Sequence, residues 1–202
     1  MKKYSVIVFD LGNVLVPFDY SVMIKKFNEL KQGLGDKFAD YYKSNYEIHR
    51  SYERGDIPEN EFIDKMLRVL ENKIDARTFC NLFSNIFKVN DDVAGLLPQL
   101  KEKYKLVLLS NTNSIHREYG WKGYPFLKYF DKLILSYEVH AVKPEEKIYL
   151  AAEDYTKVSS SEHFFIDDIL EYVDGAKKAG WDADQFTGYK KLVSDLKDRN
   201  II

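Results

Sequence analysis

Three short runs of β-branched and aromatic residues, each ending abruptly in a polar side chain, constrain this chain more than any other feature. The runs and the residues that follow them are 4–9 (YSVIVF) before Asp10, 105–109 (KLVLL) before Ser110, and 163–166 (HFFI) before Asp167. Continuous apolar runs of this length are typical of parallel strands that are buried on both faces. The pattern therefore predicts buried strands that each present a polar residue at the carboxyl end.

Segments with helical spacing separate these runs. They cover residues 91–103, 145–153 and 170–178, and residues 132–135 (KLIL) form a fourth candidate strand. Alternating strands and helices predict an α/β fold with a doubly wound parallel sheet. Ligands bind beyond the carboxyl ends of the strands in such sheets, so we expect the three polar residues to converge on one crevice.

The pattern changes to helices alone between about residues 21 and 88. The expected helices are 21–30, 36–50, 59–71 and 75–87. We therefore expect a small helical cap domain, residues 19–88, inserted after the first strand into an α/β core domain of residues 1–18 and 89–202. A helical insertion at this point of the chain would lie over the crevice as a lid.

Charge and composition narrow the class of partner. Thirty Lys and Arg residues balance 32 Asp and Glu residues, and no long basic run marks a nucleic-acid or anionic membrane surface. The basic start of the chain is followed by an apolar run that Asp10 interrupts, which does not fit a signal peptide, and no window is long enough to span a bilayer. We expect a cytoplasmic protein with a small-molecule partner, and no feature predicts its oligomeric state.

Each polar motif has an ordinary structural explanation when it is taken alone. Asp10 can form an Asx turn, Ser110 and Asn111 can cap a helix, and Lys143 before a proline can lie in a solvated loop. The adjacent carboxylates Asp167 and Asp168 are different, because they repel each other unless a cation lies beside them. Together the motifs supply what phosphoryl transfer requires: a nucleophile, a hard cation, hydrogen-bond donors and a positive charge.

The order and spacing of these four motifs resemble the haloacid dehalogenase superfamily. The resemblance extends from residue 4 to about residue 189 and includes the insertion point of the cap. It implies a magnesium-dependent phosphate-monoester hydrolase that acts on a small phosphometabolite, such as a sugar phosphate, through an aspartyl-phosphate. The roles it implies are Asp10 as nucleophile and metal ligand, Gly12 (through its carbonyl) and Asp168 as further metal ligands, Asp167 as an indirect or water-mediated partner, Ser110 and Asn111 as phosphate-binding residues, and Lys143 as the neutralising charge.

Gly12 departs from the pattern of most phosphatases in this superfamily, which carry an acid and base aspartate there. The segments DLGNV, LSNTN and HRSYERGDIPENEF resemble the bacterial branch that includes α-glucose-1-phosphate phosphatase, whose members also have glycine. That resemblance implies that the glycine form can be an active phosphatase, particularly on sugar 1-phosphates, whose leaving group is better than a simple alcohol. It leaves the substrate of this chain open. The alternatives are a catalytically weak or inactive binding or regulatory protein and, less favoured because it needs no acidic pair, a haloacid dehalogenase.

Residues near the first motif and in the cap are candidate substrate contacts. They are Asn13, His49, Arg50 and Glu53. Lids commonly supply specificity groups, but most polar residues of a helix face only water, so an ordinary helix surface is the alternative. Asp19 is a further candidate for the missing acid, although a loop role suits it better.

Overall fold

The computed structural model describes residues 3–202 and contains a five-stranded parallel sheet in the order β3-β2-β1-β4-β5. The strands are β1 (Val6–Phe9), β2 (Lys105–Ser110), β3 (Lys132–Leu135), β4 (His163–Asp167) and β5 (Asp182–Gln185). Phe9, the last residue of the central strand, is in register with Leu108 of β2 and Ile166 of β4. The predicted α/β fold with a doubly wound parallel sheet is therefore confirmed. Asp10 lies at the carboxyl end of the central strand of this sheet.

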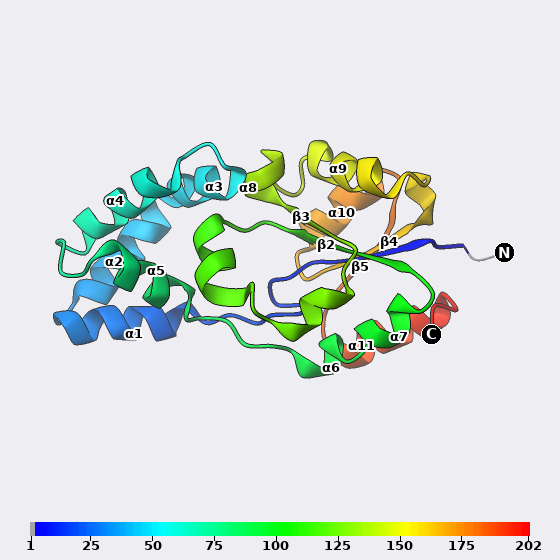
Figure 1. Ribbon diagram of the computed structural model, residues 1–202, viewed down its shortest axis with the longest axis horizontal. Coiled ribbons are helices and arrows are strands. Elements are labelled where there is room, and N and C mark those ends of the chain that lie inside the picture. Colours follow the sequence, from blue (N-terminus) through cyan, green and yellow to red (C-terminus); the bar gives the residue numbers. More distant parts are fainter. Residues whose placement is uncertain (1–2) are drawn as a thin grey trace.

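Side chains of alternate strand residues pack into two apolar cores, one on each face of the sheet. One face packs against α9 (Glu146–Thr156) and α10 (Leu170–Lys178), and the other against α6 (Asp91–Ala94), α7 (Leu97–Lys101) and α11 (Tyr189–Asp198) (Figure 1). Ile7 and Phe9 belong to one core, whereas Val6 and Val8 belong to the other. Burial on both faces explains why β1 is apolar at every position.

Five of the helices between β1 and β2 share a separate apolar core. They are α1 (Tyr20–Leu30), α2 (Leu34–Ser44), α3 (Tyr46–Arg54), α4 (Glu59–Val69) and α5 (Ala76–Ser84). Phe27, Phe38, Phe62 and Phe79 are fully buried in this core. The helices lie beyond the carboxyl ends of the strands (Figure 1). We propose that this unit is the cap domain, with the boundaries at residues 19 and 88 expected from the sequence.

Two predicted helices are broken in the structure. Residues 36–50 form α2 and α3, which are separated at Asn45, and residues 91–103 form the short helices α6 and α7. Asp19 accepts a hydrogen bond from the backbone N–H of Ser21 at 2.8 Å, which makes it the N-cap of α1. The loop role expected for Asp19 thus agrees with its place in the fold.

Two elements, β5 and α11, were not predicted from the sequence. The strand reads DADQ and lies at the edge of the sheet, where polar residues replace the apolar run that marked the other strands. Short elements complete the chain: the π-helical segment η1 (His116–Trp121), the 3-10 segments η2 (Pro125–Tyr129) and η3 (Ser160–Glu162), and α8 (Ser136–Val139). Within residues 3–202, no helix has the length and apolar character needed to cross a membrane.

Candidate active site

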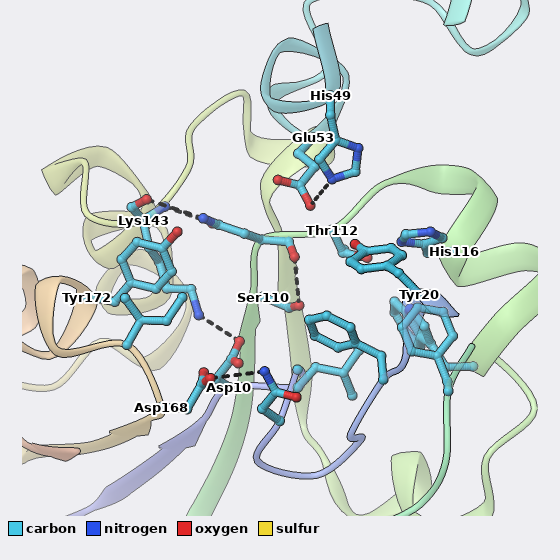
Figure 2. A pocket seen from close by; sticks show the side chains of 18 of the residues that line it. Asp10, Tyr20, His49, Glu53, Ser110, Thr112, His116, Lys143, Asp168 and Tyr172 are labelled. Atoms are coloured by element: carbon cyan, nitrogen blue, oxygen red, sulfur yellow. Dashed lines mark hydrogen bonds and ion pairs between the residues drawn. The ribbon is translucent and has the colours of Figure 1, made fainter. Parts of the chain in front are cut away.

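The polar residues at the strand ends meet in one cavity between the sheet and the helical insertion. Asp10 follows β1, Ser110 ends β2, and Asp168 follows β4. All three line a cavity of about 220 Å³, together with Gly12, Asn13 and Asn111 (Figure 2). The convergence expected from strand-end geometry is therefore what the structure shows.

Lys143 joins two of the carboxylates beneath this cavity. Its Nζ lies 2.6 Å from Oδ1 of Asp10 and 2.5 Å from Oδ2 of Asp167, and all three side chains are buried. Burial lowers the pKa of Lys143, but the charges of Asp10 and Asp167 outweigh burial and raise it overall. Lys143 is therefore a fixed positive charge next to the Asp10 carboxylate.

Asn111 holds the backbone of Lys143 on both sides. Its Oδ1 accepts from the N–H of Lys143 at 2.8 Å, and its Nδ2 donates to the carbonyl of Lys143 at 3.2 Å. The family resemblance implies that Asn111 binds phosphate. In the structure its side chain positions the lysine, and one amide N–H remains for a ligand.

Three carboxylates can approach one cation. Oxygens of Asp10, Asp167 and Asp168 all lie within 4.8 Å of one another. Asp167 is already engaged, because its two oxygens accept from Lys143 and from the N–H of Ile169 at 2.8 Å. The carboxylates of Asp10 and Asp168 are therefore better placed than that of Asp167 to contact a cation.

The chemistry of these groups fits magnesium. The pKa of Asp10 is raised to about 7: burial raises it most, Lys143 opposes that rise, and the charges of Asp167 and Asp168 add to it. Burial also raises the pKa of Asp168. A hard cation beside two such carboxylates would favour their ionised forms, and all-oxygen donors are those that Mg²⁺ prefers. The carbonyl of Gly12 accepts from the N–H of Val14 at 2.7 Å and keeps a second lone pair.

The four substrate candidates occupy different positions. His49 and Glu53 line the cavity from α3, and Nε2 of His49 lies 3.1 Å from Oε1 of Glu53. Asn13 also lines it but donates to Oδ2 of Asp168 at 3.1 Å, so it orients a carboxylate. Arg50 is not among the lining residues; its Nη2 donates to the carbonyl of Lys143 at 3.2 Å. For Arg50 the structure therefore shows a contact with the Lys143 loop in place of the cavity contact expected.

Several lining residues were not candidates in the sequence analysis. They include aromatic and polar side chains from the cap and from the core: Tyr20, Tyr42, Tyr46, Thr112, His116, Trp121 and Tyr172. Only the docking of the helical insertion on the sheet brings these residues together, and no local motif marks it.

His116 is a buried histidine that stays neutral. Its backbone N–H donates to Oδ1 of Asn113 at 2.9 Å, which leaves the amide nitrogen of Asn113 to donate to Nδ1 of His116 at 3.2 Å. Burial, and then the proximity of His49, lower the pKa of His116 to about 3. The neutral ring therefore carries its hydrogen on Nε2.

Stability is expected to fall in mild acid because of His116. The unfolded chain takes up a proton near pH 6.5, whereas the folded chain does so only near pH 3. Stability is thus fully present above pH 6.5 and is lost as the pH falls toward 3, by about 2 kcal/mol between pH 7 and 5. Denaturant unfolding of the wild type and His116→Gln across this range measures the effect. Equal pH slopes for the two proteins would contradict it.

Comparisons with known proteins agree with this geometry. The family model of the haloacid dehalogenase-like hydrolases matches residues 4–180. A D-ribitol-5-phosphate phosphatase of Bacteroides thetaiotaomicron is 30% identical over 193 residues, which cover 89% of this chain and 90% of the relative. A phosphorylated carbohydrates phosphatase of Thermotoga maritima is 24% identical, with coverage of 86% and 81%.

A solved structure adds a liganded neighbour. An enzyme of this family from Bacteroides thetaiotaomicron, in complex with magnesium and inorganic phosphate, superimposes with a TM-score of 0.76 at 27% identity. The match covers 90% of this chain and 93% of that one.

The chain belongs to the haloacid dehalogenase-like hydrolases, and among them to the phosphatases. The family and the hydrolase activity predicted from the four motifs are thereby confirmed.

Proposed function

We propose that this protein is a magnesium-dependent hydrolase of small sugar or polyol phosphates that works through an aspartyl-phosphate at Asp10. The observation that carries the proposal is the contact of Lys143 with both Asp10 and Asp167 at the floor of a cavity that Ser110 and Asp168 also line. A buried lysine, a carboxylate nucleophile and a hydroxyl together match the needs of phosphoryl transfer.

The reaction divides into two displacements. In the first, an oxygen of Asp10 attacks phosphorus and the bond to the substrate's leaving oxygen breaks. Lys143 neutralises charge between Asp10 and the phosphoryl group, while Ser110 and Asn111 donate to its oxygens. In the second, water attacks phosphorus and frees Asp10. Asp167 holds the Nζ of Lys143 in place throughout.

Asp10, the carbonyl of Gly12 and Asp168 would hold Mg²⁺ at the edge of the cavity. The cation would supply positive charge to the phosphoryl oxygens and keep the carboxylates ionised. Asn13 keeps Asp168 oriented through its hydrogen bond. These residues were expected as ligands from the family resemblance.

The size of the cavity favours a small substrate. A volume of about 220 Å³ lies below the range of pockets that enclose drug-sized ligands. The relatives' names point to phosphorylated sugars and polyols, which fit this volume better than a nucleic acid or a protein substrate does. We further propose a cytoplasmic location, in keeping with a substrate that is a free metabolite.

Phosphate release from a panel of metabolite phosphates tests the proposal. The panel includes D-ribitol 5-phosphate, glucose 1-phosphate and glucose 6-phosphate, each assayed with magnesium and with a chelator. We expect release that requires magnesium and differs among the substrates. If no compound releases phosphate while magnesium still binds, the inactive binding or regulatory alternative holds.

A further inference from the structure

The chain offers no acid to the cavity two residues after the proposed nucleophile. Position 12 is glycine, and a Cβ there would lie 3.2 Å from Cε1 of Phe18, so an aromatic ring borders the space of the absent side chain. Among the described residues that line the cavity, the carboxylates are Asp10, Asp168 and Glu53. Asp10 is the proposed nucleophile and Asp168 a proposed metal ligand, which leaves Glu53 for proton transfer.

We propose that Glu53, paired with His49, is the general acid and base of this enzyme. The inference rests on the proposed function, because it concerns the leaving group of the same reaction. In this assignment the acid comes from the cap helix α3 and not from the core.

The position of Glu53 suits an in-line displacement. The nucleophile and the leaving oxygen lie on opposite sides of phosphorus in such a reaction. Figure 2 shows Glu53 and His49 across the pocket from Asp10 and Asp168. A phosphate bound at Asp10 would therefore turn its leaving oxygen toward α3.

Two hydrogen bonds hold α3 against the core, across the cavity from Asp10. The backbone carbonyl of Glu53 accepts from Oγ of Ser136 at 2.6 Å. One turn earlier, Arg50 donates to the carbonyl of Lys143, the residue whose Nζ contacts Asp10. The helix that carries Glu53 is thus anchored to the loop that carries the catalytic lysine.

The division of roles within the pair follows from accessibility. Nδ1 of His49 is buried without a hydrogen-bond partner, and its Nε2 contacts Oε1 of Glu53, so we assign the direct proton transfer to Glu53. The side chain of Glu53 is 12% exposed, which leaves it reachable from the cavity. The i, i+4 spacing brings the two side chains together on one face of α3, and this face lines the cavity.

Protons balance over the two displacements. Before reaction the pair holds one shared proton. As the Asp10–phosphorus bond forms, Glu53 gives this proton to the leaving oxygen and becomes a carboxylate beside neutral His49. In the second displacement the attacking water gives a proton to Glu53, the Asp10–phosphorus bond breaks, and the pair regains its starting state.

Other titratable groups surround the pair. Tyr20 from α1, Tyr42 from α2, Tyr46 and Arg50 from α3, and His116 from η1 interact electrostatically with Glu53 or His49. Burial raises the pKa values of the three tyrosines, so their hydroxyls stay neutral across the working range. Within residues 3–202, Glu53 is the only carboxylate that lines the cavity from the cap.

Leaving-group dependence of Glu53→Gln tests the assignment. An alkyl leaving group needs protonation, whereas p-nitrophenolate does not. We expect Glu53→Gln to lower kcat on the best alkyl phosphate by about 10²- to 10⁴-fold. With p-nitrophenyl phosphate, the variant should release a rapid burst of nitrophenolate equal to the enzyme concentration, followed by slow turnover, because water activation in the second displacement is lost. His49→Gln should show the same pattern with a smaller loss.

Controls separate this inference from the proposed function. Glu47→Gln removes an exposed carboxylate from the same helix and should match the wild type. If the wild type releases no phosphate from any substrate, the proposed function fails. Two results in an active wild-type background would overturn the assignment of Glu53 while the proposed function stands. In the first, Glu53→Gln keeps full activity on alkyl phosphates. In the second, Glu53→Gln loses activity equally on both substrates and shows no burst.

Discussion

Asp10→Asn is expected to abolish magnesium-dependent phosphate release, lowering kcat by at least about 10⁴-fold, because an amide cannot form the covalent intermediate. The fold should persist. The amide oxygen can still accept from Lys143, and Lys143 keeps its contact with Asp167 at 2.5 Å. Removing the charge of Asp10 also relieves its repulsion from Asp167 and Asp168. Steady-state phosphate release and thermal unfolding of the same preparations measure the two effects.

An exposed aspartate provides the control for this variant. Asp174 lies on α10 with its side chain in solvent, so Asp174→Asn removes the same charge away from the proposed nucleophile. It should retain wild-type activity. Magnesium-dependent turnover in Asp10→Asn at more than a hundredth of the wild-type rate would contradict the role of Asp10.

Lys143→Met is expected to lower the free energy of unfolding by about 3 to 5 kcal/mol at neutral pH, in addition to abolishing activity. The substitution keeps much of the side-chain volume but leaves Asp10 and Asp167 buried without their cationic partner. The pKa of Asp10, which Lys143 lowers in the wild type, must rise as a result. Acids with raised folded-state pKa values lose stability as the pH rises, so the deficit of the variant should be largest at neutral and alkaline pH and smaller in acid.

Magnesium should restore part of this loss, because a cation beside Asp10 and Asp168 replaces some of the missing charge. Denaturant unfolding with magnesium and with chelator, at two pH values, gives both comparisons. Lys147→Met, an exposed neighbour on α9, should change stability by no more than about 0.5 kcal/mol. A deficit in Lys143→Met that is equal at both pH values and unaffected by magnesium would show that packing, and not charge, is what Lys143 supplies.

The strand-end residues can be predicted from the sequence because their positions depend on local pattern. A parallel strand that is buried on both faces leaves a continuous apolar run, and the residue after it must lie at the carboxyl edge. The apolar runs alone therefore place Asp10 and Asp167 at this edge. The polar edge strand β5 has no such run, and no sequence pattern indicates it.

The residues that line the cavity from the cap cannot be predicted from local sequence, because their position depends on how the helical insertion packs on the sheet domain. His49 and Glu53 were candidates only because they lie in a lid, and their pairing on one face of α3 follows from i, i+4 spacing. That this face meets the cavity depends on the contacts of α3 with Ser136 and with the loop of Lys143, residues more than 80 positions away in the chain. No local pattern encodes such a contact, and for the same reason Arg50 was assigned to the cavity while His116 and Trp121 were not.

The proposed mechanism requires a covalent phosphoryl group on Asp10, which a chemical trapping experiment can detect. Enzyme that is turning over its best substrate is quenched, treated with borohydride to reduce any acyl phosphate to homoserine, digested, and sequenced by mass spectrometry. We predict homoserine at position 10, formed only when both substrate and magnesium are present. Aspartate recovered unchanged at position 10 under rapid turnover, or homoserine at another carboxylate, would contradict the account.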